Sequence, residues 1–366
     1  MKEHASDHVF AGSVRLRVRG SGRVLRHFAA EYGPVAPPAG PAHPGHDDPP
    51  PAGVPDVEVA IRFGTRLEPL PGGTLLVGGH KTARWRVALG PPDHAPLRAS
   101  IALAGGPPSI ALSLVQGYFV EALVAVALAR AGRVALPSAG FFTEDGATVL
   151  LGRSGTGKTT LTARALAAGR TVLSDDQVVI DSTGCVWRYP RRLRFYPDIR
   201  ETAPEAWALL RPGTRTALVR RGTVRRMTRG YVAPSLAVPA SEIGGTVEDG
   251  ALLLQRIVIV DRAALEELTT TPRDPAWVVQ QAGLVLADQR DRLSRDLGGA
   301  WAAALDAALA AEQRTLTAAL AGVPATEVVV PRAWDARRSV DALDAHLGLT
   351  SGRAAPPAVP PPTHAR

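Results

Sequence analysis

One short glycine-rich segment constrains the fold of this chain more than any other. It reads Gly-Arg-Ser-Gly-Thr-Gly-Lys-Thr and occupies residues 152–159. An apolar, partly β-branched run at 147–151 precedes it, and a run of helix-forming residues at 159–168 follows it. Glycine adopts backbone torsions that other residues avoid, so a tight loop can turn several N–H groups to one side. The pattern predicts a strand, a loop and a helix in that order, within an α/β fold.

The same segment fits the phosphate-binding loop pattern of glycine, four residues, Gly-Lys and then Ser or Thr. In such a loop the lysine contacts the β- and γ-phosphates, and the hydroxyl ligates Mg²⁺. Lysine occurs only at positions 2, 81 and 158, since arginine carries nearly all other positive charge. Lys158 is thus an exception at a position where a small, rotatable ammonium is needed. The residues expected to bind ATP are Gly152, Arg153, Ser154, Gly155, Thr156, Gly157, Lys158, Thr159 and Thr160.

Two adjacent aspartates follow the next predicted strand. That strand is the short run at 171–174, and Asp175 and Asp176 come directly after it. Open α/β sheets bind ligands at the carboxyl ends of their strands, and neighbouring side chains point in different directions. One carboxylate could therefore hold Mg²⁺ while the other accepts a proton from an attacking hydroxyl. A solvated turn is the alternative, because aspartate is common in turns.

The loop, its helix and residues 173–180 together resemble the kinase domain of HPr kinase/phosphorylase and its relatives. That family has a similar loop, followed at a similar interval by an Asp-Asp pair. The resemblance covers about residues 136–260 and implies an α/β kinase domain with a mixed, partly antiparallel sheet of the HPr-kinase/PEP-carboxykinase type. It also implies catalytic roles for Asp175, as the base that deprotonates a Ser or Thr hydroxyl, and for Lys158. Thr159 and Asp176 would hold Mg²⁺.

The sequence departs from that family in three respects. Leu136-Pro137-Ser138 stands where relatives commonly have a Leu-His pair, so no histidine can assist there. The Glu-Ile-Arg-Gly signature of true HPr kinases is missing, although Arg200 and Glu201 lie at a comparable distance. The N-terminal half also differs from the usual N-terminal domain. We therefore expect a divergent member with its own acceptor, since relatives phosphorylate small peptides or small molecules as well as proteins.

Length and composition suit a globular protein of two or three domains. The 366 residues are 45% hydrophobic, which is enough for a sizeable core. A single cysteine, Cys185, excludes an internal disulfide and a cysteine-based metal site, and it fits a reducing interior. The start of the chain lacks the apolar core of a signal peptide, and Gln116 and Glu121 interrupt the most apolar stretch, 109–130. We expect a cytoplasmic protein without a membrane span.

The pattern divides the chain into four parts. Residues 1–117 are expected to form a β-rich domain that carries a disordered, Pro-rich insert at 34–55. Residues 118–272 would form the kinase-like domain. Residues 273–350 would form a mainly helical region, and 351–366 a disordered tail.

Within these parts, several elements can be predicted. Alternation predicts a strand at 14–24, and apolar spacing predicts a helix at 118–130. Hairpins are expected at 141–151 and 177–189, where turn residues separate apolar runs. Asp261 follows a further apolar strand and is an alternative magnesium ligand.

Residues 206–241 contain no acidic residue and seven arginines: Arg211, Arg215, Arg220, Arg221, Arg225, Arg226 and Arg229. Such a density attracts phosphates or an acidic partner. It could be a loop that clamps the γ-phosphate, a docking surface for an acidic peptide, a nucleic-acid contact, or a solvated loop. The formal charge of +8 keeps nucleic acid open as a partner. Within 211–241, however, Tyr231 is the only aromatic residue, so a stacking platform is not evident. Arg191, Arg192 and Arg194 could also reach a nucleotide.

We therefore expect an ATP- and Mg²⁺-dependent phosphotransferase that acts on a Ser or Thr hydroxyl of a peptide or protein. A kinase for a small hydroxyl compound is one alternative. A nucleotide-sensing or nucleic-acid-binding regulator without transferase activity is another. Relatives are often hexamers, which leaves an oligomer open.

Overall fold

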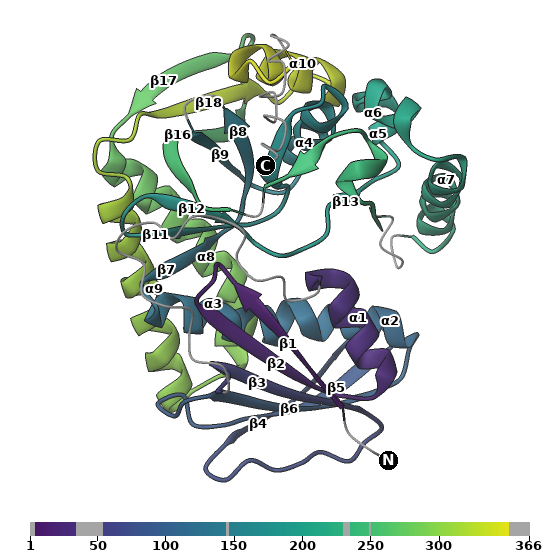
Figure 1. Ribbon diagram of the computed structural model, residues 1–366, viewed down its shortest axis with the longest axis vertical. Coiled ribbons are helices and arrows are strands. Elements are labelled where there is room, and N and C mark those ends of the chain that lie inside the picture. The colour runs from purple at the N-terminus through teal and green to yellow at the C-terminus, as the bar shows by residue number, and fades with distance from the viewer. Residues whose placement is uncertain (1–3, 34–53, 144–145, 230–234, 249, 351–366) are drawn as a thin grey trace, which may run out of the picture.

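The structure of the protein is a computed structural model with a mixed α/β architecture, in which mixed sheets are joined by C-terminal helices (Figure 1). It describes residues 4–33, 54–143, 146–229, 235–248 and 250–350. Almost all of the predicted insert at 34–55, the predicted tail at 351–366 and Tyr231 lie outside the described residues.

The N-terminal part is a six-stranded sheet in the order β1-β2-β3-β6-β5-β4, shown in purple and blue in Figure 1. Its strands are β1 (His4–Phe10), β2 (Val14–Gly20), β3 (Val57–Phe63), β4 (Thr74–His80), β5 (Ala83–Leu89) and β6 (Leu97–Ala104). Alternation along β2 buries Val14, Leu16 and Val18, while the arginines between them are less buried. One face of this sheet therefore belongs to the core.

A helix begins where the sequence predicts that the second strand continues. The strand predicted at 14–24 is wrong beyond Gly20, because α1 (Gly22–Tyr32) starts immediately after it. Val24, Phe28 and Tyr32 are four residues apart and are all buried. This spacing puts them on one helical face, which packs against the sheet.

The next helical stretch runs continuously through α2 (Pro108–Val115), a π-helical segment η1 (Gln116–Val120) and α3 (Glu121–Arg130). It starts well before the predicted helix at 118–130. Among the described residues it is the one helix whose length and composition would suffice to cross a membrane. However, 61% of its most apolar window is buried inside the structure, in a core shared with the N-terminal sheet. Its position is therefore that of a core helix.

A mixed sheet forms the second part, in the order β15-β10-β8-β9-β16-β12-β11-β7. Strand β18 also pairs with β16, and β17 pairs with the other side of β18. Its strands are β7 (Arg133–Leu136), β8 (Ser138–Thr143), β9 (Gly146–Gly152), β10 (Thr171–Ser174), β11 (Val178–Asp181), β12 (Cys185–Arg188), β15 (Thr246–Val247), β16 (Leu252–Ala263), β17 (Thr269–Arg273) and β18 (Ala325–Pro331). Both predicted hairpins are confirmed, since β8 pairs with β9 and β11 with β12 in antiparallel register.

Strand direction brings three chain segments to one edge of this sheet. Strand β8 is antiparallel to both β9 and β10, so β9 and β10 run in the same direction. Strand β16 is parallel to β9. The carboxyl ends of β9, β10 and β16 therefore meet at the same edge, which is where open α/β sheets bind ligands.

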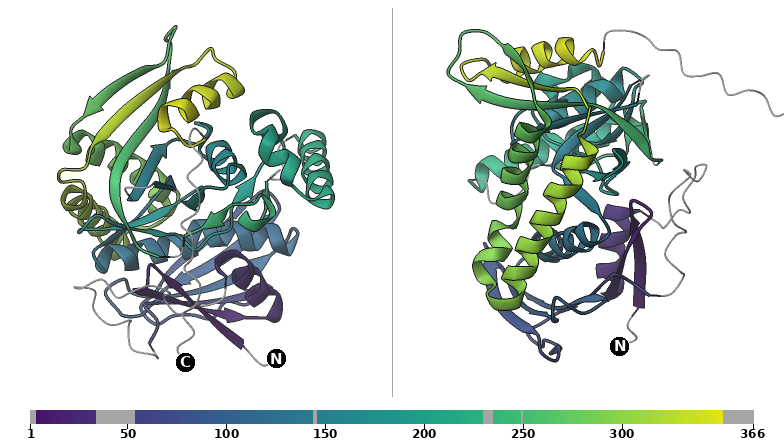
Figure 2. Two further views of the ribbon diagram at one scale, coloured as in Figure 1. Left: turned by 45° about the horizontal axis from the view of Figure 1, so that its top comes forward. Right: turned by 90° about the vertical axis from the view of Figure 1, so that its left-hand side faces the viewer.

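Further helical segments belong to the second part or join it to the first. They are α4 (Lys158–Ala167), α5 (Ile199–Thr202), α6 (Pro204–Leu209), α7 (Pro212–Met227), the 3-10 turn η2 (Ala240–Glu242), α8 (Pro275–Asp296), α9 (Gly299–Ala319) and α10 (Ala336–Leu347). The strand pair β13 (Arg194–Phe195) and β14 (Leu236–Ala237) forms a small separate ribbon. The hairpin of α8 and α9 runs along both parts of the molecule (Figure 2). Near one end of α9, buried Trp301 donates a 2.9 Å hydrogen bond to the carbonyl of Gly90 in the N-terminal part.

Candidate functional site

The loop at residues 152–159 lies between β9 and α4, in the predicted order of strand, loop and helix. Gly155 and Gly157 have φ angles of 85° and 99°, a region that other residues rarely adopt. The Thr156 hydroxyl donates a 2.9 Å hydrogen bond to the Arg153 carbonyl and closes the turn. The loop thus leads directly into the N-terminus of α4, whose first N–H groups have no partner within the helix.

This loop borders a cavity of about 1050 Å³. Most residues predicted for the site line it: Gly152, Arg153, Ser154, Gly155, Gly157, Lys158, Thr159, Thr160, Asp175 and Asp176. Thr156 is the exception, because its side chain is buried within the loop. The cavity has the size of a binding site for a cofactor-sized ligand.

Lys158 is bound to its own loop. Its ammonium group donates hydrogen bonds to the carbonyls of Gly152 and, at 3.0 Å, Arg153. Burial lowers the pKa of Lys158, and the nearby charges of Asp176 and Asp175 oppose this effect. A cation that has lost part of its hydration gains from an anionic ligand, so the group is suited to contact a phosphate.

Asp175 is the most buried acidic group of the site, with 4% of its surface exposed. Burial, reinforced by the negative charge of Asp176, raises the pKa of Asp175 to about 7. The backbone N–H of Arg194, which donates to its Oδ2 at 3.1 Å, and the charge of Arg191 act in the opposite direction. A carboxyl group with this pKa can accept and return a proton near neutral pH.

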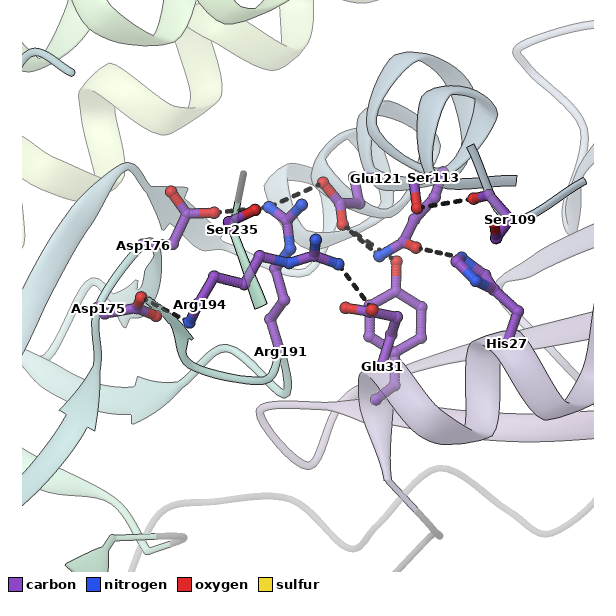
Figure 3. A network of polar contacts seen from close by, with 12 residues as sticks. His27, Glu31, Ser109, Ser113, Glu121, Asp175, Asp176, Arg191, Arg194 and Ser235 are labelled. Carbon is purple, nitrogen blue, oxygen red and sulfur yellow. Dashed lines mark hydrogen bonds and ion pairs between the residues drawn. The ribbon is translucent and has the colours of Figure 1, made fainter. Parts of the chain in front are cut away.

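Asp176 is more open, with 51% of its side chain exposed, and forms a 2.5 Å ion pair with Arg191 (Figure 3). Its carboxylate and the Thr159 hydroxyl line the same cavity and offer the hard oxygen donors that Mg²⁺ prefers. No group of three or more His, Cys, Asp or Glu residues that could hold a metal occurs in the described part of the chain. A Mg²⁺ ion on a nucleotide needs only one or two protein ligands, because phosphates and water supply the others. The donor set therefore fits such an ion.

Other cavity residues come from distant segments that no local motif marks. Tyr196 and Asp198 precede α5, Trp277 and Gln281 lie on α8, and Glu327 lies on β18. Sequence analysis missed all five. Only the fold brings them to the loop, and an isolated aromatic or amide residue carries no signal of its own.

Asp261, the alternative magnesium ligand, also lines the cavity at the end of β16. Pro137, which stands where relatives commonly have a histidine, lines the cavity as well. The described residues that line it include no histidine. Arg200 and Glu201, the partial stand-ins for the family signature, lie on α5 and are not among the described residues that line the cavity.

The arginine-rich segment is mainly a helix, so the two interpretations of it as a loop are wrong for 212–227, while a docking surface and a nucleic-acid contact stay open. Proline at its start and many good helix formers explain this, since Pro fits the first turn and Arg has a high helix propensity. Helix α7 stands at the periphery of the molecule and buries only Leu218 among its described residues (Figure 1). One of its arginines, Arg225, lines the cavity. Arg191, Arg192 and Arg194 are absent from the described lining.

The chain matches no protein-family model, and a search of curated proteins finds no significantly similar sequence.

Proposed function

We propose that the protein is an ATP- and Mg²⁺-dependent P-loop kinase, a divergent relative of HPr kinase that works in the cytoplasm. It would transfer the γ-phosphoryl group of ATP to a Ser or Thr hydroxyl of a peptide or protein. One observation carries this proposal. A glycine-rich loop with Lys158 and a buried carboxyl group, Asp175, whose pKa is near 7, border the same cavity.

Each residue has a role in the proposed reaction. The N–H groups of the loop and of the α4 N-terminus would surround the phosphates, and Lys158 would stabilise the charge that develops on the γ-phosphoryl group. Thr159 and Asp176 would hold Mg²⁺, which would offset phosphate charge when bound. Asp175 would take the proton of the acceptor hydroxyl as its oxygen bonds to the γ-phosphorus and the bond to ADP breaks. It would then release the proton to water.

A peptide or protein acceptor is favoured by α7. Arg225 lines the cavity, while Arg220 and Arg226 on the same helix are exposed. Among described residues, no acidic side chain forms an ion pair with these three arginines. An acidic segment beside the acceptor hydroxyl would complement them.

A small hydroxyl compound is the second candidate acceptor. Helix α8 contributes Gln281, Asp288 and Gln289 to the same cavity, and such side chains can bind hydroxyl groups by hydrogen bonds. The two candidates differ in whether α7 matters for catalysis.

Phosphoryl transfer tests the proposal. ADP formation from ATP and Mg²⁺ would be measured for the wild type and for Asp175→Asn, with and without a panel of Ser/Thr peptides and small hydroxyl compounds. Turnover that an acceptor stimulates, and that the substitution abolishes while ATP still binds, is expected. Tight ATP binding without turnover on any acceptor would favour a nucleotide-sensing regulator instead.

A further inference from the structure

Both aspartates of the site are connected to the N-terminal part through one short segment (Figure 3). This segment follows β12 and includes Arg191 and Arg194. The Arg191 guanidinium contacts the Asp176 carboxylate at 2.5 Å, and the Arg194 backbone N–H donates to Asp175 at 3.1 Å. The segment therefore touches the proposed metal ligand and the proposed base.

Each of these arginines has a second carboxylate partner on a helix that shares the core of the N-terminal sheet. The Arg191 Nη1 lies 3.6 Å from Glu121 Oε2, at the start of α3. The Arg194 Nη2 lies 2.6 Å from Glu31 Oε1, on α1. In Figure 3 the two arginines lie between the aspartates on one side and the two glutamates on the other. A single residue, Arg191 or Arg194, thus connects each aspartate of the site to a glutamate on one of these helices.

Glu121 is itself held firmly. It is 9% exposed, on a helix whose other inward positions are apolar. Its Oε1 accepts hydrogen bonds from Gln116 at 2.9 Å and from the Tyr32 hydroxyl at 3.3 Å. The amide oxygen of Gln116 is in turn 2.8 Å from the His27 ring. A buried carboxylate is costly unless it is paired in this way, so its position is well defined.

Arg191 is shared unequally between its two carboxylates. Asp176 is closer, but it is half exposed, so water screens its charge. Glu121 is more distant but buried, so water screens its charge much less than that of Asp176. Glu121 therefore competes effectively with Asp176 for the same guanidinium group.

We propose that Glu121 is a positioning residue of the site, which acts through Arg191 to set how freely Asp176 can bind Mg²⁺. By attracting Arg191, Glu121 weakens the hold of the guanidinium on the Asp176 carboxylate, which leaves oxygen lone pairs for the metal. The contact between the Glu31 carboxylate and the Arg194 side chain would keep the Arg194 N–H group in position beside Asp175. This inference rests on the proposed function, and it gives the N-terminal part a role in metal binding.

Two substitutions with opposite expected effects test it. In Glu121→Gln the side chain keeps its size and can still accept the bonds from Tyr32 and Gln116. Among the described residues, Arg191 is then left with Asp176 as its one anionic partner. Mg²⁺ must then compete with a tighter ion pair, so the metal should bind about tenfold more weakly. In Arg191→Gln the competing cation is gone, so the metal should bind a few-fold more tightly. The double variant should behave like Arg191→Gln, because Glu121 acts only through Arg191.

A carboxylate outside the site provides the control. Glu58 on β3 is partly buried, pairs with Arg19 at 2.6 Å and lies 3.6 Å from Arg98, and it does not line the large cavity. Glu58→Gln should leave metal affinity unchanged. Thermal unfolding of every variant would report any general loss of stability.

The measurement is a Mn²⁺ titration by electron paramagnetic resonance, with protein in excess over a non-hydrolysable ATP analogue so that all of the analogue is bound. Weaker binding in Glu121→Gln, tighter binding in Arg191→Gln, and no added effect in the double variant would support the inference. A change of the same sign in both single variants, or none, would overturn it. If the wild type binds neither the analogue nor the metal, the proposed function itself fails, and the inference fails with it.

Discussion

On the N-terminal sheet, charged side chains are matched with one another, whereas at the carboxyl edge of the second sheet an acidic group is buried without a full counter-charge. Arg17 pairs with Asp7 at 2.8 Å and Arg19 with Glu58 at 2.6 Å, all on the strands of the N-terminal sheet. Asp175 in the second sheet is 4% exposed and accepts a hydrogen bond from the backbone N–H of Arg194 (Figure 3). Paired charges tolerate water and need no further explanation, but an acid kept in an unfavourable environment is typical of a functional site.

The two described lysines give the largest expected contrast. Lys158 borders the cavity, and Lys81 lies in the turn between β4 and β5. We expect Lys158→Met to lower ATP turnover by about 10²–10³-fold, because a positive group at the γ-phosphate is lost. Lys81→Met should leave turnover unchanged. Equal effects in a steady-state ADP assay would show that the cavity is not where the chemistry occurs.

Two aspartates should respond to pH in opposite directions. The pKa of Asp175 is raised to about 7 in the folded protein from 3.8, so the folded state binds more protons between these values and stability falls as pH rises through this range. Asp175→Asn removes that loss, so the variant should be more stable than the wild type at pH 8, by up to about 4 kcal/mol. The difference should shrink toward pH 4. Urea unfolding at both pH values measures it.

Asp7 is the matched case. Its hydrogen bond to Arg17 lowers its pKa, so it contributes stability above its usual carboxyl range, and that stability is lost as pH falls. Asp7→Asn should therefore destabilise the protein at pH 8, by up to about 1 kcal/mol because the pair is partly exposed. Destabilisation by Asp175→Asn at pH 8 would contradict the contrast between the two regions.

Alanine substitutions at two glycines with positive φ angles distinguish the cost of backbone strain from a loss of ligand binding. Gly157 has φ 99°, and a Cβ there would lie 3.1 Å from Val340, whereas Gly12, in the turn between β1 and β2, has φ 69° and open space around it. Alanine at either position should cost about 1 kcal/mol of stability. Only Gly157→Ala should also weaken ATP binding, by about tenfold or more, since it redirects the N–H groups of the loop. Calorimetric titration with ATP distinguishes the two outcomes.

The smallest expected effect concerns the arginines of α7. Arg220→Gln/Arg226→Gln should raise the KM for an acidic serine peptide about threefold at low salt, and the difference should vanish at high salt. The matched control is Arg84→Gln/Arg86→Gln on β5, where both arginines are exposed and donate to backbone carbonyls. If the α7 variant leaves KM unchanged at low salt, the acceptor does not dock there, and the small hydroxyl compound becomes the preferred acceptor.

The elements that the sequence predicted correctly are those set by local patterns. The strand, loop and helix around Lys158 and the hairpin of β11 and β12 follow from apolar runs and turn residues within a few positions of each other. The start of α1 was missed because the alternating pattern of β2 continues as far as Val24. The packing of Phe28 and Tyr32 in the core of the sheet stabilises a helix there instead.

The same distinction between local patterns and packing applies to the residues of the site. The loop and both aspartates could be predicted, since each follows a strand of the same sheet. Trp277 and Tyr196 could not, because only the packing of α8 and the segment before α5 brings them to the cavity. Arg191 was one of three arginines that could reach a nucleotide. In the structure it contacts Asp176 and Glu121, and no pattern in the sequence relates Glu121 to the loop.

Direct binding of ATP in the presence of Mg²⁺, measured by isothermal titration calorimetry on the wild type and Lys158→Met, tests the central claim most directly. The account predicts one ATP per chain for the wild type, competition by ADP, and binding weakened at least tenfold in the variant. No ATP binding by the wild type, or equal binding by both proteins, would contradict it.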